Sequence, residues 1–125
     1  MVTADAVRSR IEHYVKLMND GNAGAIAELY AADATLEDPI GAEPRRGREA
    51  IHEFYKVSAG AVRLELSGPI RVCGSEAAFP MVGTAGSGDH LAYIDIVDVM
   101  TFDETAQITS MRAFWSPDAI RKAGA

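Results

Sequence analysis

The sequence predicts an α+β fold, in which helices from the first half of the chain cover one face of a curved, mostly antiparallel sheet formed by the second half. Two observations predict it. Apolar residues recur at helical spacing in three segments before residue 60, whereas short β-rich runs separated by turn residues follow from residue 62. A layer of helices on a curved sheet leaves an enclosed space that could hold a ligand.

Three helices are expected, at 4–20, 23–31 and 48–59. Thr3 can cap the first helix and Gly21 can end it. The apolar stripes consist of Val7, Ile11, Tyr14, Val15 and Met18; of Ile26, Leu29 and Tyr30; and of Ile51, Phe54 and Tyr55. Each stripe includes a tyrosine, so three phenols facing one sheet could connect their hydroxyls into a chain.

Five strands are expected, at 62–66, 70–73, 77–84, 91–102 and 107–115. Clusters of Gly, Ser, Pro and Asp separate them, as turns between consecutive strands require. The glycine-rich run 83–88 lies between two expected strands rather than before a helix. It therefore predicts a hairpin and not a phosphate-binding loop.

Length and composition indicate a single globular domain over 1–125, because 48% of the residues are hydrophobic and 24% are charged. The net charge is −6, and the basic run 44–48 is too short for a nucleic-acid interface. No apolar run is long enough for a signal peptide or a membrane span, so we expect a cytoplasmic protein without a membrane partner. Cys73 is the lone cysteine, which excludes an intrachain disulfide.

No cofactor is expected from the motifs. His13, His52 and His90 do not have the spacing of metal ligands, and no serine or cysteine lies in a nucleophile-elbow pattern. The sequence therefore predicts neither a metal site nor covalent acyl chemistry.

Asp98 is an anomaly in the strand expected at 91–102. Strand alternation places it on one face with apolar residues only, which are Ala92, Ile94, Ile96, Met100 and Phe102. A carboxyl group among apolar neighbours is driven toward its neutral form, and a neutral acid can donate a hydrogen bond to negative charge on a substrate oxygen. An ion pair with a buried Arg or Lys is an equally good interpretation of this pattern.

Two further residues are candidates for chemistry. Asp38 precedes Pro39, which disfavours helical geometry and holds the aspartate in an extended conformation, although Asp-Pro before glycine is also common turn chemistry. Tyr14 lies within the first apolar stripe, so its hydroxyl needs a buried partner, in a structural or a catalytic role.

Taken in order, several segments resemble bacterial ketosteroid isomerase (steroid Δ5-isomerase), which has a cone-shaped α+β fold shared with nuclear transport factor 2-like proteins. The similarity covers residues 10–116. The matching segments are Tyr14, 32–41 (ADATLEDPIG), 53–55 (EFY), 97–102 (VDVMTF) and 110–115 (SMRAFW).

The resemblance implies isomerisation of a Δ5-3-ketosteroid to the Δ4 isomer without a cofactor. Asp38 would be the base, Tyr14 and protonated Asp98 would bind the dienolate oxygen, and Tyr30 and Tyr55 would support Tyr14. The residues expected to line the steroid cavity are Phe54, Phe79, Val99, Met111 and Trp115. A homodimer formed through the sheet is also implied.

Two other functions fit the same fold. One is a polyketide cyclase-like enzyme that acts on another enolisable substrate. The other is a steroid- or lipid-binding dimerisation module without turnover, which would need an apolar cavity but no reactive carboxylate.

Overall fold

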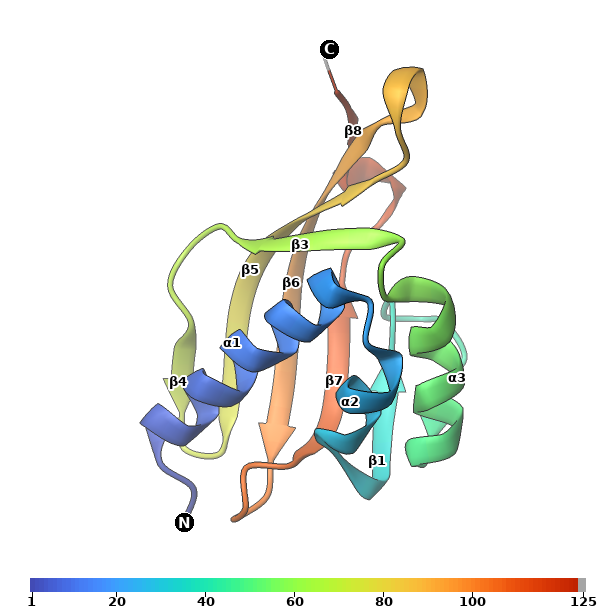
Figure 1. Ribbon diagram of the computed structural model, residues 1–125. Coiled ribbons are helices and arrows are strands. Elements are labelled where there is room, and N and C mark those ends of the chain that lie inside the picture. Colours follow the sequence, from blue (N-terminus) through green and yellow to red (C-terminus); the bar gives the residue numbers. More distant parts are fainter. Residues whose placement is uncertain (124–125) are drawn as a thin grey trace.

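In the computed structural model, which describes residues 1–123, three helices lie against one face of a curved sheet (Figure 1). The helices are α1 (Ala4–Asp20), α2 (Ala23–Glu28) and α3 (Arg48–Ser58). The strands are β1 (Tyr30–Glu37), β2 (Arg45–Arg46), β3 (Val62–Leu66), β4 (Arg71–Cys73), β5 (Glu76–Ala85), β6 (Ala92–Phe102), β7 (Ile108–Phe114) and β8 (Ile120–Lys122). The predicted α+β class is confirmed.

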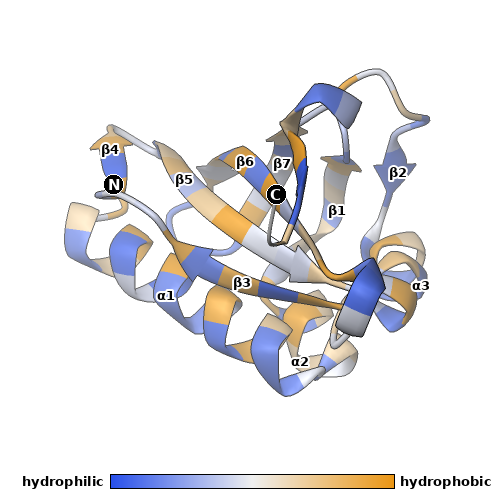
Figure 2. Ribbon diagram, turned by 90° about the horizontal axis from the view of Figure 1, so that it is seen from above, coloured by the Kyte–Doolittle hydropathy of each residue, from blue (hydrophilic) through white to orange (hydrophobic). Residues whose placement is uncertain are grey.

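The sheet is mixed and open. Its strand order is β2-β1-β7-β6-β5-β3, with β4 paired to β5 and β8 paired to β6. Strands β1 and β7 are parallel and the other pairs are antiparallel. The sheet curves around the helices (Figure 2). It does not close into a barrel, because β2 and β3 lie at opposite ends of the strand order and do not pair with each other.

The first helix has the expected ends, and its side chains tie it to the sheet. The Thr3 hydroxyl accepts a hydrogen bond from the Ala6 N–H at 3.1 Å, and Gly21 ends the helix with a left-handed φ of 71°. Near that end, the Asn19 amide donates to the Leu64 carbonyl at 2.9 Å and accepts from the Leu64 N–H at 2.7 Å. This pair of bonds holds α1 against β3, which crosses above it in Figure 1.

The second expected helix is shorter than predicted, and Tyr30 is a strand residue. Helix α2 ends at Glu28, and Tyr30 begins β1, where it pairs in parallel with Ile108 of β7. The Ile108 N–H donates to the Leu29 carbonyl at 2.8 Å. The spacing of Tyr30 fits a helix, but the residue is in a strand because it pairs with Ile108, far along the chain. The periodicity of neighbouring residues cannot reveal such a distant partner.

The five expected strands correspond to β3 to β7, and the glycine-rich run connects β5 to β6 as a hairpin. Strands β1, β2 and β8 were not predicted. The largest fully buried side chains come from helices and sheet together and include Ile11, Tyr30, Ile51, Tyr55 and Phe79. The core therefore lies between the three helices and the concave face of the sheet.

Candidate active site

A cavity of about 250 Å³ lies between the helices and the concave face of the sheet. Its lining is mostly apolar and includes two carboxyl groups and two phenols. The lining residues are Tyr14, Met18, Asp38, Phe54, Tyr55, Ser58, Val62, Leu64, Met81, Ile94, Ile96, Asp98 and Trp115. The structure thus brings Tyr14, Asp38 and Asp98 together from α1, the end of β1 and β6.

Asp98 is buried in surroundings that favour its neutral form. It is 2% exposed and lies on the inner face of β6 with Met100 and Phe102, as strand alternation requires. No Lys or Arg of the described chain lies within salt-bridge distance of it. Burial, and then the negative charge of Asp38, raise the pKa of Asp98 well above its ordinary value. The alternative of a buried ion pair is therefore wrong for this residue.

Asp38 follows the last residue of β1 and precedes Pro39, to which it is joined by a cis peptide bond. The indole N–H of Trp115 donates to Asp38 Oδ1 at 2.8 Å. Burial raises the pKa of Asp38, whereas this hydrogen bond stabilises the carboxylate and lowers it. The indole therefore favours the charged form of Asp38. No such hydrogen bond from the described residues lowers the pKa of Asp98. One cavity thus holds a carboxyl group suited to act as a base and another suited to donate a hydrogen bond.

Three tyrosine hydroxyls form a buried chain that ends in the cavity. The Tyr30 and Tyr55 hydroxyl oxygens are 2.6 Å apart, and the Tyr55 hydroxyl donates to that of Tyr14 at 3.2 Å. Burial raises the pKa of all three phenols, and the nearby carboxyl group of Asp98, in its ionised form, is the next largest cause at Tyr14. Because the Tyr14 oxygen accepts a hydrogen bond from Tyr55, the Tyr14 hydroxyl hydrogen is free to point toward a ligand.

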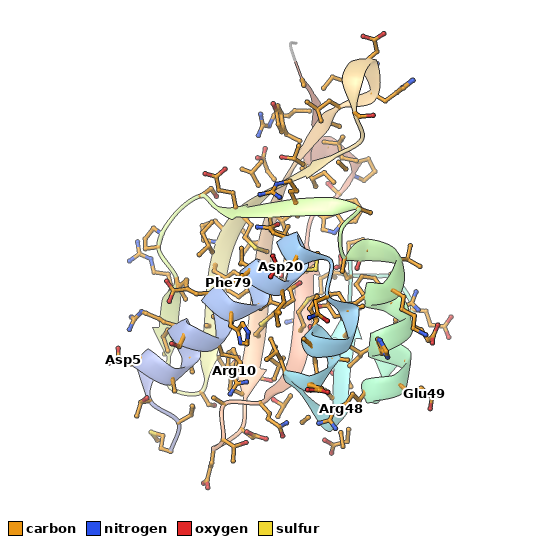
Figure 3. The ribbon with its side chains drawn as sticks, in the orientation of Figure 1. Asp5, Arg10, Asp20, Arg48, Glu49 and Phe79 are labelled. Carbon is orange, nitrogen blue, oxygen red and sulfur yellow. The ribbon has the colours of Figure 1, made fainter. Side chains whose placement is uncertain are left out.

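The expected cavity-lining residues divide into two groups. Phe54 and Trp115 line the cavity. Phe79, which is labelled in Figure 3, and Met111 are fully buried in the core and do not line the cavity. Val99 lies on the opposite face of β6, beside a groove near β4. Val99 points away because it directly follows Asp98 in an extended strand.

The prediction missed most of the apolar lining. The omitted residues are the polar Ser58 and the apolar Met18, Val62, Leu64, Met81, Ile94 and Ile96. Ile94 and Ile96 could have been identified, because they share the strand face of Asp98. Met81 is opposite Ile96 in the register of β5 and β6, which local sequence does not reveal.

Within residues 1–123, no group of three or more His, Cys, Asp or Glu side chains is arranged to hold a metal ion. None of the helices described for this chain is both long and apolar enough to cross a membrane.

Comparisons with known proteins agree with the geometry. The chain is 49% identical over 112 residues to the steroid Delta-isomerase of Nocardioides simplex, covering 89% of this chain and 90% of that protein. It is 29% identical over 119 residues to the epoxide hydrolase LasB of Streptomyces lasalocidi, and spans 42% of that protein. A solved structure of SalBIII, an epoxide hydrolase/cyclase-like enzyme in pyran ring formation in the polyether salinomycin, superposes with a TM-score of 0.89 at 29% identity, covering 98% of this chain and 99% of that one.

Residues 11–111 match the SnoaL-like domain. The chain therefore belongs to the SnoaL-like domain family, as a homologue of steroid Delta-isomerase.

Proposed function

We propose that this protein isomerises Δ5-3-ketosteroids to Δ4-3-ketosteroids by moving one proton within the substrate. The observation that carries the proposal is the pair of carboxyl groups in one apolar cavity, of which Asp98 is driven to its neutral form and Asp38 is held by an indole N–H. The 49% identity to a steroid Delta-isomerase supports the same reaction.

In the first step, the Asp38 carboxylate takes a proton from the carbon between the ketone and the C=C bond. The C–H electron pair moves into the conjugated system, and negative charge develops on the ketone oxygen. Tyr14 and neutral Asp98 would donate hydrogen bonds to that oxygen, at the point where charge appears in a site shielded from water.

In the second step, the protonated Asp38 returns the proton two carbons further along the dienolate, and the conjugated ketone forms. One base serves both steps because both carbons belong to the same short conjugated system. Tyr55 and Tyr30 would support Tyr14 through the chain of hydroxyls. Proton transfer next to a carbonyl needs a weak base and charge stabilisation, which these side chains can supply.

The test compares two conservative variants on a Δ5-3-ketosteroid, followed by the rise in conjugated-enone absorbance. Asp38→Asn removes the base and should lower kcat by about 10²–10⁴-fold. Tyr14→Phe removes one hydrogen-bond donor and should lower kcat by about 10²–10³-fold, and less than Asp38→Asn does. Turnover by Asp38→Asn equal to or better than that of Tyr14→Phe would refute the assignment of the base.

The same assay separates the other functions that fit this fold. A binding module would take up a product-like steroid without any rise in enone absorbance. A cyclase-like enzyme, as SalBIII is described, would leave the ketosteroid unchanged and convert another substrate.

A homodimer formed through the sheet is part of the proposal. Val97 and Phe114 are both 41% exposed, and they pair with each other on neighbouring strands β6 and β7. Exposed apolar side chains that form a pair on a sheet face are suited to an interface between two copies of the chain.

A further inference from the structure

The basic run 44–48 has no role in the proposed reaction, and its three arginines differ in their surroundings. Arg48 is occupied, because its guanidinium donates twice to the Tyr30 carbonyl, at 3.0 and 2.7 Å. Arg45 and Arg46 form the short strand β2, opposite Leu36 and Thr35 of β1. Both are exposed, and no carboxylate of the described chain lies within salt-bridge distance of either.

Arg45 lies over the ring of a residue that lines the cavity. Its guanidinium carbon is 5.1 Å from the centroid of Phe54, a cation–π contact. Arg45 and Phe54 also line a groove of about 190 Å³ between β2 and α3, together with Glu53, Val57 and Ser58. Glu53 is engaged by Lys56 at 2.8 Å, so the guanidinium of Arg45 is the unpaired charge of this groove.

The groove adjoins the cavity, because Phe54 and Ser58 line both. Ser58 is the last residue of α3 and lies about one helical turn beyond Tyr55, whose hydroxyl contacts Tyr14. When a fused-ring ketone is bound with its oxygen at Tyr14 and Asp98, its other end points away from these donors. A substituent at that end would reach the groove beside Arg45 if it left the cavity between Phe54 and Ser58, which line both spaces.

We propose that the groove binds an acidic substituent at the far end of the substrate, and that the preferred substrates are 3-keto-Δ5 steroids whose side chain ends in a carboxylate. A chain with a net charge of −6 repels such a ligand overall, so its capture needs a local cation. Arg45 supplies one in a planar form that can bind a carboxylate through two hydrogen bonds while it stays stacked on Phe54. This inference rests on the proposed isomerase function.

Arg46 provides a matched control. It follows Arg45 in the same strand, so its side chain points to the other face, and it does not line the groove. Figure 2 shows β2 as a hydrophilic segment beside α3. Both arginines are exposed, so replacement by glutamine removes one positive charge in each case without opening the core.

The experiment compares a 3-keto-Δ5 steroid carboxylic acid with its methyl ester, which has the same ring system but no charge. For the unmodified protein, kcat/KM should be higher for the acid, and the ratio of acid to ester should fall as salt is added. Arg45→Gln should lower this ratio by about fivefold, the upper range for one exposed ion pair, and Arg46→Gln should leave it unchanged.

An acid-to-ester ratio near one in the unmodified protein, or an equal loss in both variants, would overturn the inference and leave the isomerase function intact. If neither compound is isomerised but a Δ5-3-ketosteroid without the side chain is, the inference alone fails; if that ketosteroid is not isomerised either, the proposed function itself fails. The two failures are therefore distinguishable.

Discussion

At the scale of single residues, Asp38 and Asp98 share one cavity but differ in what stabilises their charge. Asp98 has only burial and a neighbouring negative charge, both of which raise its pKa. Asp38 receives a hydrogen bond from Trp115, which opposes the effect of burial. These surroundings favour the neutral form more strongly at Asp98 than at Asp38, as the proposed roles of hydrogen-bond donor and base require.

Asp98→Asn tests the buried neutral acid through stability. The pKa of Asp98 is raised in the folded protein, so the native state keeps a proton that the unfolded chain loses above pH ~4. The stability that Asp98 contributes is thus present below that pH and is lost as the pH rises through its folded pKa. Asparagine is neutral throughout, so the free energy of unfolding of the variant, relative to the unmodified protein, should increase from pH 4 to 8.

Urea denaturation at a series of pH values measures this difference. Asp95→Asn is the control, because Asp95 is exposed and its pKa is lowered by Arg121, so the sign is reversed. A gap between Asp98→Asn and the unmodified protein that stays constant with pH would show that Asp98 is charged in the folded state.

Trp115→Phe tests how the proposed base, Asp38, is held. Phenylalanine keeps an apolar wall but has no N–H for Asp38, so the pKa of Asp38 should rise further. The acidic limb of the profile of kcat/KM against pH should therefore move to higher pH. A raised KM with an unmoved limb would mean that Trp115 acts by contact with substrate alone.

At the scale of elements, Asn19 is the link between α1 and β3. Asn19→Ala removes two hydrogen bonds and leaves the Leu64 N–H and carbonyl without partners, at a cost of about 1–3 kcal/mol in the free energy of unfolding. Leu64 lines the cavity, so steroid binding should weaken as well. Asn19→Asp keeps the acceptor and loses the donor, and it should be intermediate in urea denaturation. Alanine without a measurable cost would show that β3 is held by packing alone.

Elements with strong local patterns were predictable, whereas those that depend on distant partners were not. The stripe around Ile11 and the alternation around Asp98 each identify an element and its buried face. Strand β1 contains Ala31, Ala32 and Asp33, which are poor strand formers, and it is stabilised by β7 and β2 on either side. Those contacts form only when the whole sheet assembles.

The same distinction applies to the site. Asp98 could be identified because a carboxyl group interrupts an apolar strand face. The bond between Trp115 and Asp38 joins residues 77 positions apart, and no local pattern indicates that their side chains meet. The apolar lining on β3 and β5 depends on sheet register in the same way.

At the scale of the whole molecule, the open sheet leaves its convex face uncovered by helices (Figure 1). Phe114 and Val97 lie there, and the Arg112 guanidinium is 5.3 Å from the Phe114 ring. Val97→Lys adds a charge to this face, and like charges would meet if two copies pack through it. We expect sedimentation to show a dimer for the unmodified protein and a monomer for Val97→Lys. Val57→Lys, at a 79% exposed position on α3, should stay dimeric.

Arg48, which is half-buried, contacts the main chain of the fully buried Tyr30. Its guanidinium anchors the Tyr30 carbonyl from the first residue of α3 (Figure 3), and the Tyr30 hydroxyl meets Tyr55 of that same helix. The strand and the helix that carry two of the three phenols are thus joined by two contacts, one from the Arg48 side chain to the Tyr30 carbonyl and one between the Tyr30 and Tyr55 hydroxyl groups. We therefore expect Arg48, which is not part of the cavity lining, to influence how the hydroxyls of Tyr30 and Tyr55 are aligned behind Tyr14.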